Sequence, residues 1–261
     1  MELRIQYAKT EDGGSIAYWT LGEAGRWVVL VPSLGRGGRD FDDLGLALAE
    51  AGFRVLAFDP RGVGESSPPP ADGTLHDVAA DVAVLIDTLD DSPVHVVGHA
   101  FGNRVARCLA SDRPDFVQTV TLLAAGGLVA PEDEMWAALA RCYQLELPEQ
   151  ERLEDIRTAF FAPASDPSVW LGGWWPSAAA AQSAAVRATP LDDWWAAGEA
   201  PLLVIQGLDD RIALPANGHT LKKQLGVRVR VVDLPDAGHA LLPEQPAAIA
   251  SEIVAFLKEQ G

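Results

Sequence analysis

Short apolar runs recur along the chain, separated by longer segments whose apolar residues repeat with helical spacing. Runs without polar alternation are typical of strands that a sheet buries on both faces. They cover residues 27–32, 54–58, 94–97, 117–124, 201–206 and 228–234. Between them, the segment 75–90 carries Val78, Val82, Leu85 and Leu89 on one side, which predicts an amphipathic helix.

Alternating strands and helices predict an α/β fold, with a mostly parallel sheet and helices on both faces. A β-hairpin is expected before it, from residues 4–8 and 15–20. Further helices are expected near residues 41–51, 101–111, 216–225 and 245–259. The alternation stops between residues 127 and 195. This helix-prone segment is predicted to be a lid inserted into a core of residues 1–126 and 196–261.

Composition narrows the class of protein. The chain has 261 residues and a formal net charge of −17, which argues against nucleic acid and anionic membrane partners. Its two cysteines, Cys108 and Cys142, cannot supply a disulfide framework or a cysteine-based metal site. No apolar run has transmembrane length, and Met1–Arg4 lacks a signal-peptide pattern. We therefore expect a cytoplasmic protein that acts on a small molecule.

The segment Gly98-His99-Ala100-Phe101-Gly102 lies between a predicted strand and a predicted helix. A G-x-S-x-G nucleophile elbow occupies this position in one group of hydrolases, where small residues allow a sharp strand-to-helix turn. Both glycines are present here, but alanine replaces the central serine. At this motif the chain resembles the α/β-hydrolase fold family, and the resemblance extends from about residue 4 to residue 259.

Three other segments carry the same resemblance. The loop 59–66 reads DPRGVGES, similar to the D-x-R-G-x-G-x-S loop of the family. Asp210, in Gly207-Leu208-Asp209-Asp210-Arg211, is implied as the catalytic acid, with Asp209 as its neighbouring alternative. His239 follows the next strand and is implied as the catalytic base. The order 100, 210, 239 is the family's order of nucleophile, acid and base.

An oxyanion hole is the next element that the resemblance implies. Its N–H donors would be Phe101, after the nucleophile position, and Leu34, in the loop after the strand 27–32. This loop reads Val31-Pro32-Ser33-Leu34-Gly35, where relatives often have His-Gly before the donor. Ser33 could contact a ligand or cap the loop.

Alanine at position 100 leaves the mechanism open, because it cannot form an acyl-enzyme. The serine of an ester or lactone hydrolase has been replaced, or alanine is native and His239 with Asp210 acts as a general base. The second hypothesis fits a hydrolase, a lyase or an isomerase. A binding protein is a third hypothesis. No metal and no nucleotide cofactor is implied, since ligand spacing and a G-x-G-x-x-G motif are absent.

Six of the eight tryptophans lie between residues 136 and 195. Most are expected to pack the lid onto the core. Trp174 and Trp175, beside Gly172 and Gly173, are the pair expected to line a pocket and contact the substrate. An aromatic pocket favours an uncharged, apolar substrate such as an ester or a lactone.

Overall fold

The structure is a computed structural model that describes residues 4–261, so Met1–Leu3 of the signal-peptide expectation lie outside the described residues. Within this range one eight-stranded sheet has the order β1-β2-β4-β3-β5-β6-β7-β8. Strand β2 pairs antiparallel with both β1 and β4, and the remaining pairs are parallel. The strands are β1 (Gln6–Lys9), β2 (Ser15–Leu21), β3 (Trp27–Val31), β4 (Arg54–Phe58), β5 (Val94–His99), β6 (Val117–Leu123), β7 (Leu202–Gly207) and β8 (Val229–Leu234).

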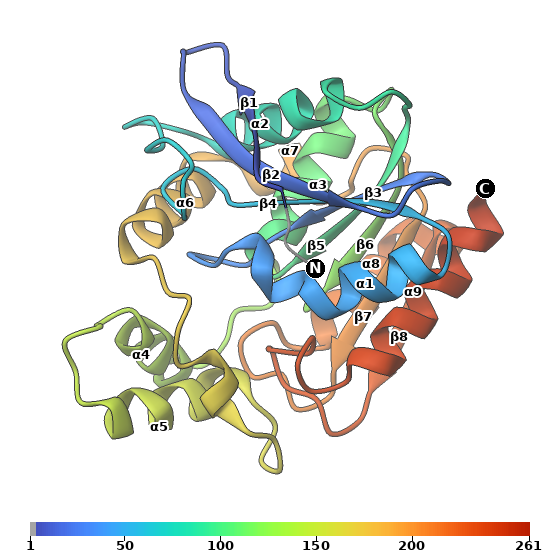
Figure 1. Cartoon of the computed structure of the whole chain (residues 1–261). Coiled ribbons are helices and arrows are strands. Elements are labelled where there is room, and N and C mark those ends of the chain that lie inside the picture. The colour runs from blue at the N-terminus through green and yellow to red at the C-terminus, as the bar shows by residue number, and fades with distance from the viewer. Residues whose placement is uncertain (1–3) are drawn as a thin grey trace.

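Helices cover both faces of this sheet (Figure 1). On one face pack α1 (Asp42–Glu50) and α9 (Pro246–Gln260). On the other face pack α2 (Leu75–Asp87), α3 (Phe101–Asp112) and α8 (Ala216–Leu225). Short 3-10 turns, η1 (Gly38–Phe41) and η3 (Gly226–Arg228), precede α1 and β8. The predicted fold class, an α/β fold with a mostly parallel sheet, is confirmed.

Burial on both faces explains the continuous apolar runs. Along β3, Val29 and Val31 belong to the core under α2 and α3, while Val28 and Leu30 belong to the core under α1 and α9. Successive side chains of a strand point to opposite faces, so both sets of positions must be apolar when both faces are covered.

Residues 127–195, which we term the cap segment, contribute helices but no strand, and all of them are described. Two helices, α4 and α5, pack together and project beyond the sheet, whereas α7 packs on α3 (Figure 1). The elements are α4 (Asp133–Cys142), α5 (Glu149–Phe160), η2 (Pro167–Trp170), α6 (Pro176–Ala188) and α7 (Leu191–Trp194). None of the helices within residues 4–261 combines the length and the apolar character that crossing a bilayer requires.

One polar side chain in the sheet makes stability depend on pH. His95, on β5, is buried, and its Nδ1 lies 2.9 Å from Oγ1 of Thr119 on β6. Burial lowers the pKa of His95 to about 4, because the imidazolium would lose its hydration. Between about pH 6.5 and pH 4, the unfolded chain therefore binds a proton that the folded chain does not. The free energy of unfolding consequently falls as the pH falls through this range.

We expect the substitution His95→Gln to reduce the loss of stability in acid. Between pH 7 and pH 5, the free energy of unfolding of the wild type should fall by about 2 kcal/mol more than that of the variant. Urea denaturation of both proteins at the two pH values measures this shift. A difference that stays constant would contradict the assigned titration of His95.

Candidate active site

The turn between β5 and α3 holds Ala100 in a strained conformation, with φ 49° and ψ −104°. Positive φ is uncommon for residues other than glycine. The turn closes tightly, because a Cβ on Gly98 would overlap the carbonyl oxygen of Gly102. A Cβ on Gly102 would in turn overlap the carbonyl oxygen of Val31, at the end of β3. Both glycines of the motif are therefore required by backbone contacts, and the residue between them faces a cavity.

Asp210 and His239 lie together at the carboxyl end of the sheet. Nδ1 of His239 is 2.9 Å from Oδ2 of Asp210, and both side chains are buried. The other oxygen of Asp210 accepts the N–H groups of Ile212 at 2.8 Å and Ala213 at 2.7 Å. This leaves one oxygen to orient the imidazole. Asp209, the neighbouring alternative, is exposed, and so the geometry favours Asp210.

His99 forms a hydrogen bond to the backbone of His239. Its Nε2–H donates to the carbonyl oxygen of His239 over 2.8 Å. Burial, together with the nearby His239 ring, lowers the pKa of His99 to about 3, so this imidazole stays neutral. The residue before position 100 thus positions His239.

Glu244 holds the segment that carries His239, and sequence reasoning missed it. One carboxylate oxygen accepts the N–H of Ala162 at 2.8 Å, from the cap segment. The other accepts the N–H groups of Gly238 at 2.8 Å and Leu241 at 3.1 Å, on either side of His239. No motif in the sequence marks this glutamate, and one of its partners, Ala162, lies 82 residues away in the chain.

The N–H groups of Leu34 and Phe101 both belong to residues that line the cavity, and neither has an acceptor within residues 4–261. Phe101 begins α3, where the first N–H groups of a helix have no partner in the helix. The Leu34 loop is held by the cap segment: the Tyr143 hydroxyl donates to the Leu34 carbonyl oxygen at 2.7 Å. Gln182 accepts the Gly35 N–H at 2.7 Å. The cap segment therefore fixes one of the two candidate oxyanion donors.

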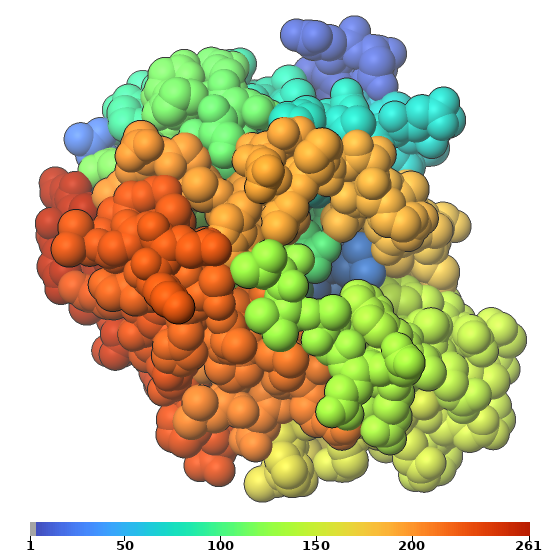
Figure 2. All heavy atoms as spheres, turned by 180° about the vertical axis from the view of Figure 1, so that it is seen from behind, coloured from blue at the N-terminus to red at the C-terminus, as the bar shows by residue number. Residues whose placement is uncertain are grey.

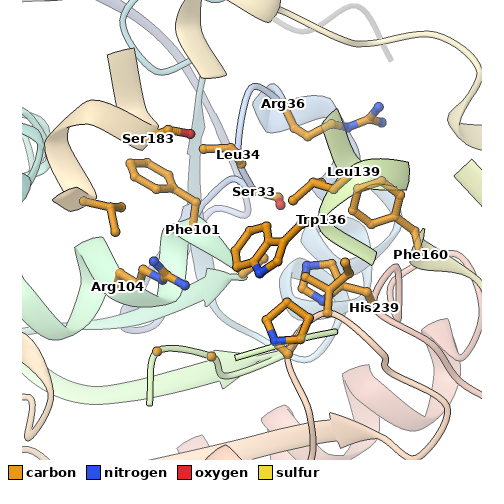
Figure 3. A pocket seen from close by; sticks show the side chains of 18 of the residues that line it. Ser33, Leu34, Arg36, Phe101, Arg104, Trp136, Leu139, Phe160, Ser183 and His239 are labelled. Atoms are coloured by element: carbon orange, nitrogen blue, oxygen red, sulfur yellow. The ribbon is translucent and has the colours of Figure 1, made fainter. Parts of the chain in front are cut away.

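These groups surround a cavity of about 410 Å³. Figure 2 shows it as a hollow between the orange and yellow-green parts of the cap segment, and Figure 3 shows the side chains around it. Ser33 is buried and lines it. Four tryptophan or phenylalanine side chains of the cap segment line it as well. They are Trp136, Phe160, Trp170 and Trp174.

The expected pocket pair of Trp174 and Trp175 is corrected by the structure. Trp174 lines the cavity, but Trp175 is 40% exposed and does not. The two residues are consecutive in a non-helical segment just before α6, so their side chains point in different directions. Trp194 and Trp195 lie instead in the core beside α3.

His76, Cys108 and Asp112 form a separate cluster, with possible ligand atoms within 4.8 Å of one another. The sequence had indicated no metal ligands. Nδ1 of His76 lies 2.8 Å from Asp112, and burial raises the pKa of the Cys108 thiol far above its ordinary value. Sγ of Cys108 lies 3.5 Å from Nδ1 of His76 and 3.6 Å from Oδ2 of Asp112, so the three side chains form a hydrogen-bonded group.

The fold matches that of known enzymes. A family model described as the alpha/beta hydrolase fold matches residues 26–149. A non-heme chloroperoxidase of Streptomyces lividans is 28% identical over 95% of this chain and 98% of its own. A crystal structure of a hydrolase from Pseudomonas aeruginosa PA01 superposes with a TM-score of 0.80 and 28% identity, covering 97% of this chain and 98% of that one. The enol-lactonase from Burkholderia xenovorans LB400 superposes with a TM-score of 0.78 and 26% identity, covering 97% of this chain and all of that one.

The chain therefore has the α/β-hydrolase fold, and its relatives place it among hydrolases. The sequence motifs predicted this fold, and the family model over residues 26–149 and the solved structures confirm it.

Removing the carboxylate of Glu244 should loosen the His239 segment. For Glu244→Ala we expect a loss of about 2 kcal/mol in the free energy of unfolding, because three backbone N–H groups lose their acceptor. Urea denaturation measures this loss. The matched control is Glu252→Ala, on α9, since Glu252 is similarly half-buried and makes no side-chain hydrogen bond in the described part of the chain. Equal losses in both variants would contradict the assigned role of Glu244.

Proposed function

We propose that the cavity hydrolyses small carboxylic esters or lactones, with His239 and Asp210 transferring the proton. The observation that supports this most is the free Nε2 of His239, which has no protein partner within residues 4–261, on a residue that lines the cavity. Leu34 and Phe101 offer two unpaired N–H groups to the same cavity. A positioned base beside two oxyanion donors is the set of groups that acyl transfer requires.

With alanine at position 100, the attacking group is a water molecule. His239 Nε2 takes one proton from the water as its oxygen bonds to the acyl carbon. Asp210 holds the Nδ1–H and stabilises the imidazolium that forms. The carbonyl oxygen becomes an oxyanion between the N–H groups of Leu34 and Phe101. The bond to the alcohol oxygen then breaks, and His239 returns the proton to this oxygen, giving a carboxylic acid and an alcohol.

A second form of the same reaction has serine at position 100. The observation that favours it is the backbone of Ala100, whose positive φ matches the strained turn that presents a nucleophile in this fold. The methyl side chain of Ala100 has no chemical role that requires this strained conformation. A serine oxygen there would attack the acyl carbon directly and form an acyl-enzyme, which water would then hydrolyse.

Hydrolysis of p-nitrophenyl butyrate tests the proposed roles. We expect His239→Ala and Asp210→Asn each to lower the rate constant of turnover at least 100-fold, because the general base is lost or misoriented. The control is His219→Ala on α8, an exposed histidine that pairs with Asp233 at 3.1 Å and does not line the cavity. Turnover that His239→Ala leaves unchanged would overturn the proposal.

The substitution Ala100→Ser distinguishes the two forms of attack. We expect the serine variant to release a burst of p-nitrophenol and to gain the mass of a butyryl group, whereas the alanine protein shows neither. If the serine variant turns over the ester faster than the alanine protein, the result supports a turn adapted to a serine nucleophile. An equal or slower rate supports water as the native attacking group. Absence of turnover in both proteins, with ligand binding retained, would identify a binding protein and overturn the hydrolase.

A further inference from the structure

Arg104 brings a positive charge into the cavity. It lies on α3, four residues after Ala100, which is about 6 Å along the helix axis. Its side chain lines the same cavity as Phe101 and His239, and Figure 3 shows its guanidinium group directed toward the space between them.

No acid neutralises this guanidinium. Within residues 4–261, Arg104 makes neither an ion pair nor a side-chain hydrogen bond, and burial alone lowers its pKa. Its neighbours are uncharged or cationic: Gly126, the ring of Trp194 at 5.7 Å, and Arg107 in the next turn of α3. Arg107 donates only to neutral acceptors, the carbonyl oxygens of Asn103 and Gly126 and the side-chain oxygen of Asn103. The positive charge of the pair is therefore uncompensated by protein groups.

The rest of the lining adds no negative charge. No aspartate or glutamate lines the cavity, although the chain contains 37 acidic residues. Of the other lining arginines, Arg36 is neutralised by Asp40, which accepts two hydrogen bonds of 2.7 Å from it. Arg187, at the end of α6, is exposed. Arg104 is thus the half-buried arginine of the lining that has no acidic partner and that a ligand in the cavity would meet.

We propose that the ligand of this cavity carries a carboxylate group, which forms a bidentate ion pair with Arg104. This inference rests on the proposed function and specifies its substrate class: an ester or lactone with a carboxylate at the end away from the reacting carbonyl. It changes the substrate expected from the sequence, which was uncharged. The chain between the two groups remains apolar, as the aromatic lining requires.

A physical reason supports a carboxylate rather than a neutral group. A guanidinium removed from water without a partner loses hydration energy, and a charged ligand restores this loss. The planar fork of arginine matches the two oxygens of a carboxylate, and such charge-assisted pairs are strong in a weakly polar site. The separation of Arg104 from Ala100 along α3 also places the carboxylate several bonds from the carbon that reacts.

Two ligands that differ only in charge test the inference without turnover. Adipic acid monoamide has one carboxylate and one amide carbonyl, and adipic diamide replaces the carboxylate with a second amide. Isothermal titration calorimetry gives the dissociation constant of each. We expect the wild-type protein to bind the monoamide at least 10-fold more tightly, and Arg104→Met to remove most of this preference. Arg104→Lys should retain part of it, because the charge stays and the fork is lost.

The control variant is Arg157→Met, which removes a positive charge outside the cavity, where Arg157 donates to the Ser165 carbonyl oxygen at 3.1 Å. It should keep the wild-type preference. Thermal melting confirms that each variant is folded, and if Arg104→Met is not, Arg104→Gln takes its place. Equal binding of both ligands by the wild type, or a preference that survives loss of Arg104, would overturn the inference.

Failure of this inference can be distinguished from failure of the proposed function. The binding preference is expected to persist in His239→Ala, since that substitution leaves Arg104 in place. An anion preference without ester hydrolysis would refute the hydrolase alone. Hydrolysis of p-nitrophenyl butyrate without an anion preference would refute the carboxylate assignment alone.

Discussion

The contact between the start of α3 and the end of β3 determines where every other part of the site can lie. Gly102 sits directly against the carbonyl oxygens of Val31 and Pro32, closer than any Cβ would permit. This contact places the N–H of Phe101 near the loop that begins at Pro32 and carries Leu34. It also directs position 100 into the cavity that His239 lines. Gly98 and Gly102 thus bring the candidate oxyanion donors close to position 100.

The cap segment completes the site as well as covering it. It holds the Leu34 loop through Tyr143 and Gln182, and through Trp175, whose N–H donates to the Gly35 carbonyl oxygen at 3.0 Å. At its other contact, the Ala240 N–H donates to the Phe160 carbonyl oxygen at 2.8 Å, next to His239. A movement of the whole cap segment would therefore disturb both a candidate donor and the candidate base. The hollow visible in Figure 2 is consistent with a ligand that enters without such a movement.

The sequence predicted those parts of the fold and site that depend on local patterns. Runs such as Trp27–Val31 indicated buried strands, and the glycines around Ala100 indicated a sharp turn. Asp210 and His239 could be selected because the resemblance to the family implies an acid and a base at these positions, and each follows a predicted strand. Glu244 could not be selected, since no motif marks it and its contact with Ala162 joins segments that only the folded chain brings together. The same holds for Arg104: the sequence displays a charge but not whether an acid lies beside it.

The charge of the whole chain and the charge of its cavity act over different distances. The net charge of −17 comes from acidic residues that do not line the cavity. At physiological salt, surface charges are screened beyond about 8 Å, whereas a guanidinium in a weakly polar cavity is screened much less. The proposed selection of an anion is therefore compatible with an acidic protein, because it would take place beside Arg104 after the ligand has left the water. Net charge thus describes the electrostatics of the surface, whereas the proposed sign of the ligand depends on which charge in the cavity lacks a partner.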